Sequence, residues 1–235
     1  MSVQIELFYD YVCPFCYLGE VPFEQAIEGM DVDVKLCPFE LRRPPVPKVD
    51  PMHDEAKIKR FDEVLYPEAQ RLGVEMKLPW ISPHPYTTLT FQGFYYAKEF
   101  GKETEYNHAI FHRFYVDEQD IGELPVIKEV LTELGLDAAG MDAVAAEGRY
   151  LDQLNADKVY ARETREVKSI PTFIIGSQRL TGIHSVEEFK QAIADAEAEA
   201  AEFEGMHCGE DGCDFGGAPE EEAGMHCGED GNCEF

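Results

Sequence analysis

Two cysteines that directly follow an apolar stretch place the strongest constraint on how this chain can fold. From Val3 to Tyr9 the apolar side chains alternate along the chain, and this period-2 pattern predicts a strand. The sequence Cys13-Pro14-Phe15-Cys16 follows after a short turn, and Pro14 has the fixed φ that suits the first position of a helix. A CxxC between a strand and a helix is typical of a redox-active dithiol. The alternatives are half of a zinc site or two incidental thiols.

The expected position at a helix start gives the two cysteines different roles. The unpaired N–H groups of a first helical turn and the positive end of the helix dipole both favour a thiolate over a thiol. We therefore expect Cys13 to be an exposed nucleophile. Cys16 lies one turn further along the helix, so we expect it to be a buried resolving thiol.

The composition argues against several classes of function. The 235 residues are 44% hydrophobic, which is enough for a real core in one large domain or two small ones. No apolar run approaches the 18 or so residues that a membrane-spanning helix needs. The net charge of −27 argues against binding to nucleic acid or to an anionic membrane surface.

The start of the chain and the cysteine count bear on location. The first strand begins at once, without a basic segment and an apolar stretch before it, so we expect no secretory signal and a cytoplasmic protein. In that compartment, seven cysteines favour redox or metal chemistry over a framework of structural disulfides.

The predicted elements divide the chain into two α/β pieces, a helical block and a tail. Residues 1–47 and 168–203 hold all the predicted strands, and residues 48–167 read as helices. The two α/β pieces complete one sheet only if residues 48–167 are an inserted all-helical domain. Residues 204–235 form an acidic, cysteine-containing tail that we expect to be flexible.

Local signals predict several boundaries inside these parts. Asp50-Pro51 is expected to cap a helix that runs to about Gly73. A second strand is expected from Val32 to Glu40, and a helix over residues 151–167. Strands 172–175 and 178–181 should form a hairpin around Gly176-Ser177, and Ser185-x-x-Glu188 is a capping box for the last helix.

A second motif lies at Ile170-Pro171-Thr172, just before the predicted hairpin. In a thioredoxin fold a cis-proline precedes the strand beside the CxxC, and the cis peptide exposes the backbone of the preceding residue. Pro171 would then be that cis-proline, and the backbone of Ile170 could pair with an extended substrate chain across the dithiol. The alternative is an ordinary trans proline that begins a strand.

An eight-residue repeat occurs in the tail. The segment GMHCGEDG at 205–212 recurs letter for letter at 224–231, and each copy is followed by a second cysteine. The last Lys or Arg is Lys190, and from residue 191 to the last residue the charges at pH 7 are all acidic. The repeat contributes these residues: His207, Cys208 and Cys213 in the first copy, and His226, Cys227 and Cys233 in the second.

Three interpretations of the tail remain open. The pairs Cys208–Cys213 and Cys227–Cys233 could form a second redox site that exchanges with the Cys13–Cys16 pair. Together with His207 and His226 they could instead bind zinc or cadmium, although the spacing matches no common zinc module. The third interpretation is a solvated tail with inert thiols. Because acidic neighbours raise the pKa of a thiol, the tail cysteines should react more slowly than Cys13.

For the other cysteine and for three histidines we expect structural rather than catalytic roles. Cys37 lies among apolar residues of a predicted strand, which indicates a buried thiol. His84, His108 and His112 are scattered along the helical block, and we interpret them as surface or hydrogen-bonded core histidines.

With these motifs in place, the chain resembles the DsbA-like branch of the thioredoxin superfamily, specifically its FrnE-type cytosolic members. The resemblance spans about residues 1–200 and rests on three segments: FYDYVCPFCYLG at 8–19, FHRFYVDEQDI at 111–121, and IPTFI at 170–174 with TGIH at 181–184. It implies an α/β thioredoxin fold with an inserted helical domain and thiol–disulfide oxidoreductase or isomerase activity. It also implies Cys13 as nucleophile, Cys16 as resolving thiol and Pro171 as the cis-proline.

The match to the family has two departures. Where the family has Gly-Val-x-Gly-Val before the cis-proline, this chain reads EVKSI at 166–170. FrnE-type proteins are similar in carrying a C-terminal Cys-x4-Cys, which falls on Cys208 and Cys213. The second pair, Cys227 and Cys233, exceeds that pattern.

The same branch includes kappa-class glutathione transferases and 2-hydroxychromene-2-carboxylate isomerases. They resemble this architecture but typically have a serine in place of the thiol pair and bind glutathione, so a glutathione-dependent transferase or isomerase is the alternative enzyme. The dithiol reaction requires no bound cofactor, and glutathione and zinc are the alternatives considered. The expected partners are protein or small-molecule thiols and disulfides, together with a recycling reductant or oxidant.

Overall fold

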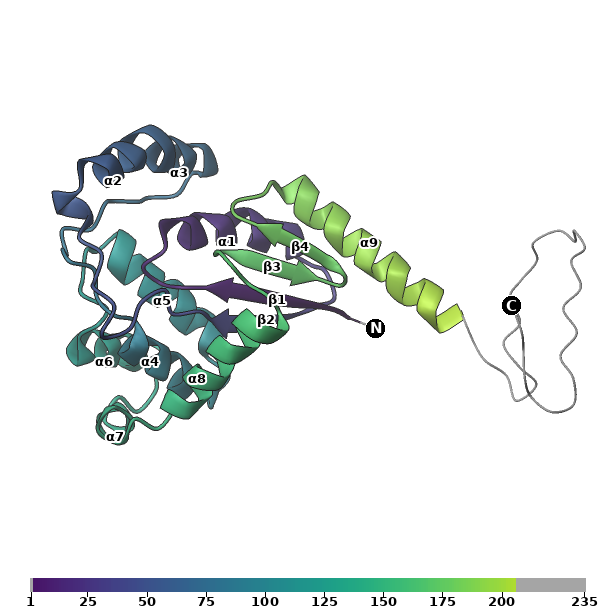
Figure 1. The fold of residues 1–235 in the computed structure, drawn as a ribbon. Coiled ribbons are helices and arrows are strands. Elements are labelled where there is room, and N and C mark those ends of the chain that lie inside the picture. Colours follow the sequence, from purple (N-terminus) through teal and green to yellow (C-terminus); the bar gives the residue numbers. More distant parts are fainter. Residues whose placement is uncertain (1, 206–235) are drawn as a thin grey trace, which may run out of the picture. The chain divides into compact units, whose positions relative to one another are not determined.

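The computed structural model describes residues 2–205, and its centre is a four-stranded sheet of order β2-β1-β3-β4 (Figure 1). The strands are β1 (Val3–Tyr9), β2 (Val32–Pro38), β3 (Thr172–Ile175) and β4 (Gln178–Thr181). β1 pairs in parallel with β2 and antiparallel with β3, and β3 pairs antiparallel with β4. The sheet therefore joins the two ends of the described chain, because the N-terminal strand lies beside a strand that begins at residue 172.

The two faces of β1 face different apolar clusters. Ile5 and Leu7 face the main core, together with Phe23 of helix α1 (Pro14–Ile27) and Phe189 of helix α9 (Val186–Gly205). Phe8 points the other way, into a smaller cluster on the opposite face. The strand predicted from the period-2 alternation is therefore present, and both of its faces are buried.

Every regular element between β2 and β3 is helical. The α-helices are α2 (Glu55–Arg60), α3 (Tyr66–Leu72), α4 (Thr88–Lys98), α5 (Glu103–Tyr115), α6 (Leu124–Glu133), α7 (Gly140–Glu147) and α8 (Leu151–Val159). A 3-10 turn, η1 (Pro51–His53), and two π-helical turns, η2 (Phe61–Leu65) and η3 (Tyr160–Thr164), complete the set. The domain boundaries at 47/48, 167/168 and 203/204 stay a prediction.

The helix expected from Asp50 to about Gly73 is broken into shorter pieces. Asp50 does not cap it; Asp54 caps α2 by accepting from the N–H groups of Ala56 and Lys57 at 3.1 and 3.2 Å. The π-helical turn η2 precedes Pro67, which has no N–H for the α-helical pattern. The predicted end is confirmed, because Gly73 adopts a φ of 69° and terminates α3.

Two other predicted boundaries shift. β2 ends at Pro38 rather than at Glu40. The helix expected over residues 151–167 is regular only as α8 and then becomes the π turn η3. After Pro38 the chain stays near β1, where the Phe39 N–H donates to the Tyr9 carbonyl oxygen at 2.8 Å.

The C-terminal signals are confirmed. β3 and β4 form the hairpin around Gly176, which adopts a φ of 56°. In the capping box, the Glu188 N–H donates to Ser185 Oγ at 3.2 Å and the Ser185 N–H donates back to the Glu188 carboxylate at 2.7 Å. Within residues 2–205, none of the helices is long and apolar enough to cross a membrane.

Candidate active site

The CxxC lies in the connection from β1 to α1, with Cys13 at the N-cap of α1 and Pro14 in its first turn. The carbonyl oxygen of Cys13 accepts from the N–H groups of Cys16 and Tyr17 at 3.0 and 3.3 Å, which starts the helix. Cys13 and Cys16 are both free thiols. The predicted placement of the dithiol at a helix start is therefore confirmed.

The accessibility of Cys13 differs from the prediction. Cys13 is only 7% exposed and Cys16 is fully buried, so the expectation of an exposed Cys13 is wrong. The reason is a long-range contact: the Cys13 thiol donates to the main-chain oxygen of Ile170, with Sγ 3.7 Å from that oxygen. Burial, reinforced by the neighbouring Cys13 thiol, raises the pKa of Cys16 well above its usual value.

The loop before β3 reaches the dithiol through Ile170 and Pro171. Their peptide bond is cis, as the sequence predicts, and Pro171 is buried. Helix α1 approaches closely because it presents Gly19: a Cβ at that position would lie 3.2 Å from Pro171 Cγ. The structure thus brings Cys13, Cys16, Ile170 and Pro171 together, and their chemical roles stay predictions.

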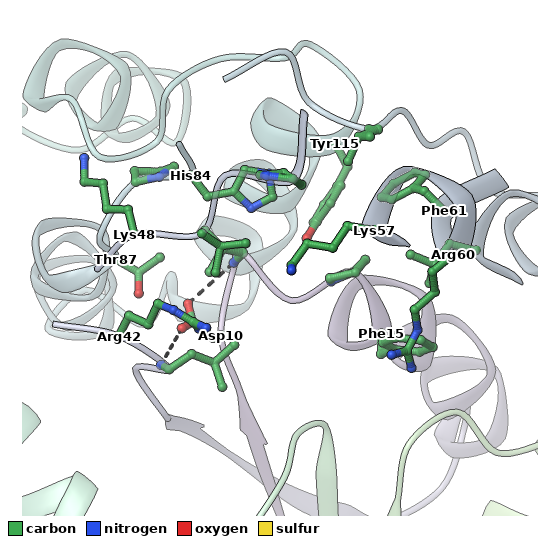
Figure 2. Close-up of a pocket in the computed structure, with 18 of the residues that line it drawn as sticks. Asp10, Phe15, Arg42, Lys48, Lys57, Arg60, Phe61, His84, Thr87 and Tyr115 are labelled. Atoms are coloured by element: carbon green, nitrogen blue, oxygen red, sulfur yellow. Dashed lines mark hydrogen bonds between the residues drawn. The ribbon is translucent and has the colours of Figure 1, made fainter. Parts of the chain in front are cut away.

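A buried carboxyl group that the sequence analysis did not single out lies beside the dithiol. Asp10 is fully buried, and burial raises its pKa to about 7. Its carboxylate accepts from the Leu41 N–H at 2.7 Å (Figure 2), while its main-chain oxygen accepts from the Cys13 N–H at 3.0 Å. Its position three residues before Cys13 is the signal that could have identified it.

A cavity of about 220 Å³ opens next to the dithiol loop (Figure 2). Its walls come from the dithiol loop, the chain after β2, helix α2, the turn before α4 and the end of α5. Many of the lining side chains are apolar, including Phe15, Phe61 and Leu65. Four basic residues also line it: Arg42, Lys48, Lys57 and Arg60.

Three buried polar groups in the cavity wall have no hydrogen-bond partner within residues 2–205. They are Nε2 of His84, a residue that is 8% exposed, Oγ1 of Thr87, a residue that is 1% exposed, and the hydroxyl of Tyr115, a residue that is fully buried. Burial lowers the pKa of His84 to about 4, so its ring is neutral at pH 7. The interpretation of His84 as a satisfied or surface histidine is therefore wrong, and no sequence signal links it to the dithiol.

One group of side chains in residues 2–205 has the composition of a metal site. Ligand atoms of Glu20, Glu24 and His108 lie within 4.8 Å of one another. They already have protein partners: Asn107 Nδ2 donates to both oxygens of Glu20 at 2.9 and 3.0 Å, and His108 pairs with Glu24. Burial raises the pKa of Glu20 to about 8.

Of the remaining cysteines, Cys37 lies within the described residues and the four tail cysteines do not. Cys37 is 5% exposed, and burial raises the pKa of its thiol to about 12, which confirms the buried interpretation. The tail residues lie outside the described residues: His207, Cys208, Cys213, His226, Cys227 and Cys233. The second redox site and the metal site in the tail stay predictions.

A parallel strand pair continued by an antiparallel hairpin, with a CxxC at the start of α1 and a cis-proline before β3, defines a thioredoxin-like dithiol fold. A family model described as the DSBA-like thioredoxin domain matches residues 4–194, and the chain belongs to this family. The predicted thioredoxin-like fold class and the DsbA-like family are thereby confirmed, and the FrnE-type assignment stays a prediction.

Comparisons with individual proteins agree with this assignment. The uncharacterized protein YwbO of Bacillus subtilis (strain 168) is 40% identical over 195 residues, which cover 83% of this chain and 98% of that protein. A probable DsbA oxidoreductase of Streptomyces coelicolor superposes with a TM-score of 0.75 at 25% identity, over 92% of this chain and 100% of that one.

Two further solved structures share the fold at lower identity. A 2-hydroxychromene-2-carboxylate isomerase has a TM-score of 0.70 at 16% identity, over 85% of this chain and 98% of its own. The cytosolic disulfide reductase DsbM of Pseudomonas aeruginosa, solved with glutathione, has a TM-score of 0.59 at 20% identity, over 85% of this chain and 98% of its own.

Proposed function

We propose that this protein is a thiol–disulfide oxidoreductase that uses Cys13 as the attacking thiol and Cys16 as the resolving thiol. One observation carries the proposal: two free thiols lie in the first turn of α1, and the outer one contacts the main chain of Ile170. That arrangement holds a reactive sulfur next to a main-chain segment that can pair with a substrate. Membership of the DSBA-like family supports the same chemistry.

The first step is attack by Cys13 on a substrate disulfide. The Cys13 thiolate forms a bond to one substrate sulfur, the substrate S–S bond breaks, and the other sulfur leaves as a thiolate. The product of this step is a mixed disulfide between Cys13 and the substrate.

The second step is resolution by Cys16. After Cys16 loses its proton, its sulfur attacks the sulfur of Cys13 and releases the second substrate thiolate. The substrate disulfide has gained two electrons, and the dithiol has lost them to become the Cys13–Cys16 disulfide. An external dithiol or glutathione would reduce the pair again, and the same steps in reverse oxidise a substrate dithiol.

Glutathione is the alternative reactant that one comparison favours, since DsbM was solved with it. In this alternative the chain is a glutathione-dependent transferase or isomerase, similar to 2-hydroxychromene-2-carboxylate isomerase. It would then bind glutathione without exchanging thiols. The pair of cysteines argues for exchange instead. We infer a cytoplasmic location, in keeping with the compartment named for DsbM.

The deciding experiment is the reduction of insulin by dithiothreitol, followed as turbidity. The intact protein should accelerate precipitation, and Cys13→Ser should abolish the acceleration. Full acceleration by Cys13→Ser would exclude the proposal. Cys37→Ser is the matched control, because this buried thiol lies outside the site and its replacement should leave the rate unchanged.

A second variant tests the order of the two thiols. In a chain whose four tail cysteines are replaced by serine, Cys16→Ser should accumulate a mixed disulfide with the substrate, detected as added mass on the intact protein. Cys13→Ser in the same background should accumulate none. Saturable glutathione binding without any thiol exchange would instead favour the transferase alternative.

A further inference from the structure

The cavity beside the dithiol has an unusual charge for this protein. The chain carries 47 acidic and 20 basic residues, yet among residues 2–205 four basic side chains line this one cavity and Asp10 is the only acidic one that does. Because burial raises the pKa of Asp10 to about 7, this carboxyl offsets only part of the positive charge. The cavity is therefore a local attractor for anions on a strongly acidic protein.

Three of the four cations have no carboxylate partner among residues 2–205. Lys57 pairs with Asp54, whereas Arg42, Lys48 and Arg60 form no ion pair there. Two of these three lie against aromatic rings instead: Arg60 is 4.9 Å from the centre of the Phe15 ring, and Lys48 is 5.1 Å from that of Tyr86. Stacking fixes the direction of these side chains and leaves their N–H groups free for a ligand.

Three buried polar groups without a hydrogen-bond partner among residues 2–205 also lie in the same wall. Buried polar atoms almost always have a partner, so an unpartnered one needs an explanation. Here three such atoms, His84 Nε2, Thr87 Oγ1 and the Tyr115 hydroxyl, belong to residues that line one cavity, and Figure 2 shows the Tyr115 ring reaching toward its centre. A ligand that brings hydrogen-bonding groups would give these atoms partners.

The size and position of the cavity indicate what part of a ligand it receives. A volume of about 220 Å³ is smaller than the roughly 300–1,000 Å³ of pockets that enclose a whole drug-sized molecule. Pro14 and Phe15, which lie between the two cysteines, form part of its wall. The cavity therefore suits one group of a molecule whose sulfur lies at Cys13.

We propose that this cavity is a specificity subsite that binds a carboxylate carried close to the reacting sulfur of the substrate. Arg42, Lys48 and Arg60 supply the positive charge that attracts the carboxylate, the Tyr115 hydroxyl donates to it, and the apolar wall contacts the carbon skeleton. The inference rests on the proposed oxidoreductase function and adds its substrate class: anionic thiols and disulfides, either small molecules or acidic polypeptide segments.

The test compares matched disulfides that differ in charge. The protein is the full chain with its four tail cysteines replaced by serine, reduced beforehand and mixed with 5,5′-dithiobis(2-nitrobenzoate), which is anionic, or 4,4′-dithiodipyridine, which is neutral. Cys13 attacks either disulfide and releases one coloured thiolate, so a single turnover needs no added reductant. The measured quantity is the ratio of the anionic to the neutral second-order rate constant.

The subsite predicts how this ratio changes. Arg60→Gln and Arg42→Gln should each lower the ratio by about fivefold or more, Arg60→Lys should retain most of it, and Tyr115→Phe should lower it moderately. Arg162→Gln is the matched control, because Arg162 lies 5.0 Å from the Phe39 ring in a similar stacked geometry but does not line the cavity. It removes the same charge and should leave the ratio within twofold.

Each outcome separates the two proposals. If the anionic ratio is unchanged in Arg42→Gln and Arg60→Gln, or falls equally in Arg162→Gln, the subsite is excluded while the dithiol chemistry stands. If Cys13→Ser reacts as fast as the parent with the neutral disulfide, the proposed oxidoreductase function fails.

A second pair of probes distinguishes small-molecule from polypeptide substrates. It compares a short cysteine peptide disulfide with glutamate next to the cysteine against the same peptide with glutamine in that place. Discrimination between these peptides assigns the subsite to polypeptides, and its absence assigns it to small molecules.

Discussion

The thiol of Cys13 lies 3.7 Å from the main-chain oxygen of Ile170, a residue 157 positions further along the chain. This contact exists because β1 and β3 are neighbours in the sheet and Gly19 lets α1 approach Pro171. It gives the outer thiol a partner outside the dithiol, while Cys16 is enclosed on all sides. The two sulfurs of one four-residue motif thus have different surroundings.

The first prediction concerns the order in which the thiols are alkylated. Brief treatment of the reduced native protein with iodoacetamide at pH 7.5 should modify Cys13 well before Cys16 or Cys37. The reason is that burial raises the pKa of both inner thiols, in the case of Cys37 to about 12. Peptide mapping by mass spectrometry assigns each site, including those of the tail.

The control for this experiment is the same treatment in 6 M guanidinium chloride. There the three thiols should be modified at similar rates, because the burial that separates them is gone. Equal modification of Cys13 and Cys16 in the native protein would contradict the assignment of a reactive and a resolving thiol.

The second prediction uses the buried carboxyl of Asp10. Its pKa of about 7 means that a negative charge develops near Cys16 as the pH rises through neutrality, and that charge opposes formation of the Cys16 thiolate. Asp10→Asn should therefore close the Cys13–Cys16 disulfide at nearly the parental rate at pH 5.5 and roughly threefold faster above pH 8, equivalent to about half a pKa unit. Stopped-flow measurement of the second released thiolate, in the tail-serine background, gives this rate.

Whether Asp10→Asn closes the Cys13–Cys16 disulfide faster or more slowly than the parent shows whether the carboxyl opposes or assists Cys16. A variant that closes the disulfide more slowly than the parent at every pH would show that the carboxyl assists Cys16 instead of opposing it. A ratio of variant to parent that stays constant between pH 5.5 and 8.5 would show that Asp10 does not titrate there.

The third prediction concerns stability and Glu20. Burial raises the pKa of this carboxyl from 4.5 to about 8, so between those values the folded state binds a proton that the unfolded state has released. The free energy of unfolding should therefore fall as the pH rises from about 4.5 to 8. At about 1.4 kcal/mol per pKa unit, the loss is up to about 5 kcal/mol.

Glu20→Gln tests this by removing the titration. The variant should be close to the parent at pH 4.5 and clearly more stable at pH 9, as measured by urea unfolding at several pH values. Glu129→Gln is the control for the loss of one carboxylate, because Glu129 of α6 is exposed and forms no ion pair within residues 2–205. Parallel pH profiles for the parent and Glu20→Gln would contradict the raised pKa.

The local parts of the fold were accessible from the sequence because local interactions specify them. Alternation specifies β1, the Ser185–Glu188 capping box marks the start of α9, and Gly73 ends α3 at a positive φ. Short signals of this kind act over three or four residues. At these three places they describe the local structure correctly.

The cavity could not be predicted, because its parts meet only in three dimensions. Arg42 and Arg60 flank the dithiol loop only because the chain after β2 and helix α2 both pack near it, and Tyr115 arrives from the end of α5. The burial of Cys13 likewise depends on Ile170. No pattern predicts α7 either, since its alanine-rich sequence lacks a strong apolar period.

The last prediction tests how tightly the helical block is packed. Helix α4 presents Gly93 to α5 and α6, and a Cβ there would lie 2.9 Å from Ile127 Cγ2 and closer still to the Tyr106 hydroxyl. Alanine favours a helix by about 1 kcal/mol over glycine, but overpacking costs roughly 1–3 kcal/mol. Gly93→Ala should therefore be destabilised by up to about 2 kcal/mol in urea unfolding, and by less in a Tyr106→Phe background, which removes the clashing oxygen. Strict additivity of the two substitutions would show that the Tyr106 hydroxyl is not what excludes a side chain at position 93.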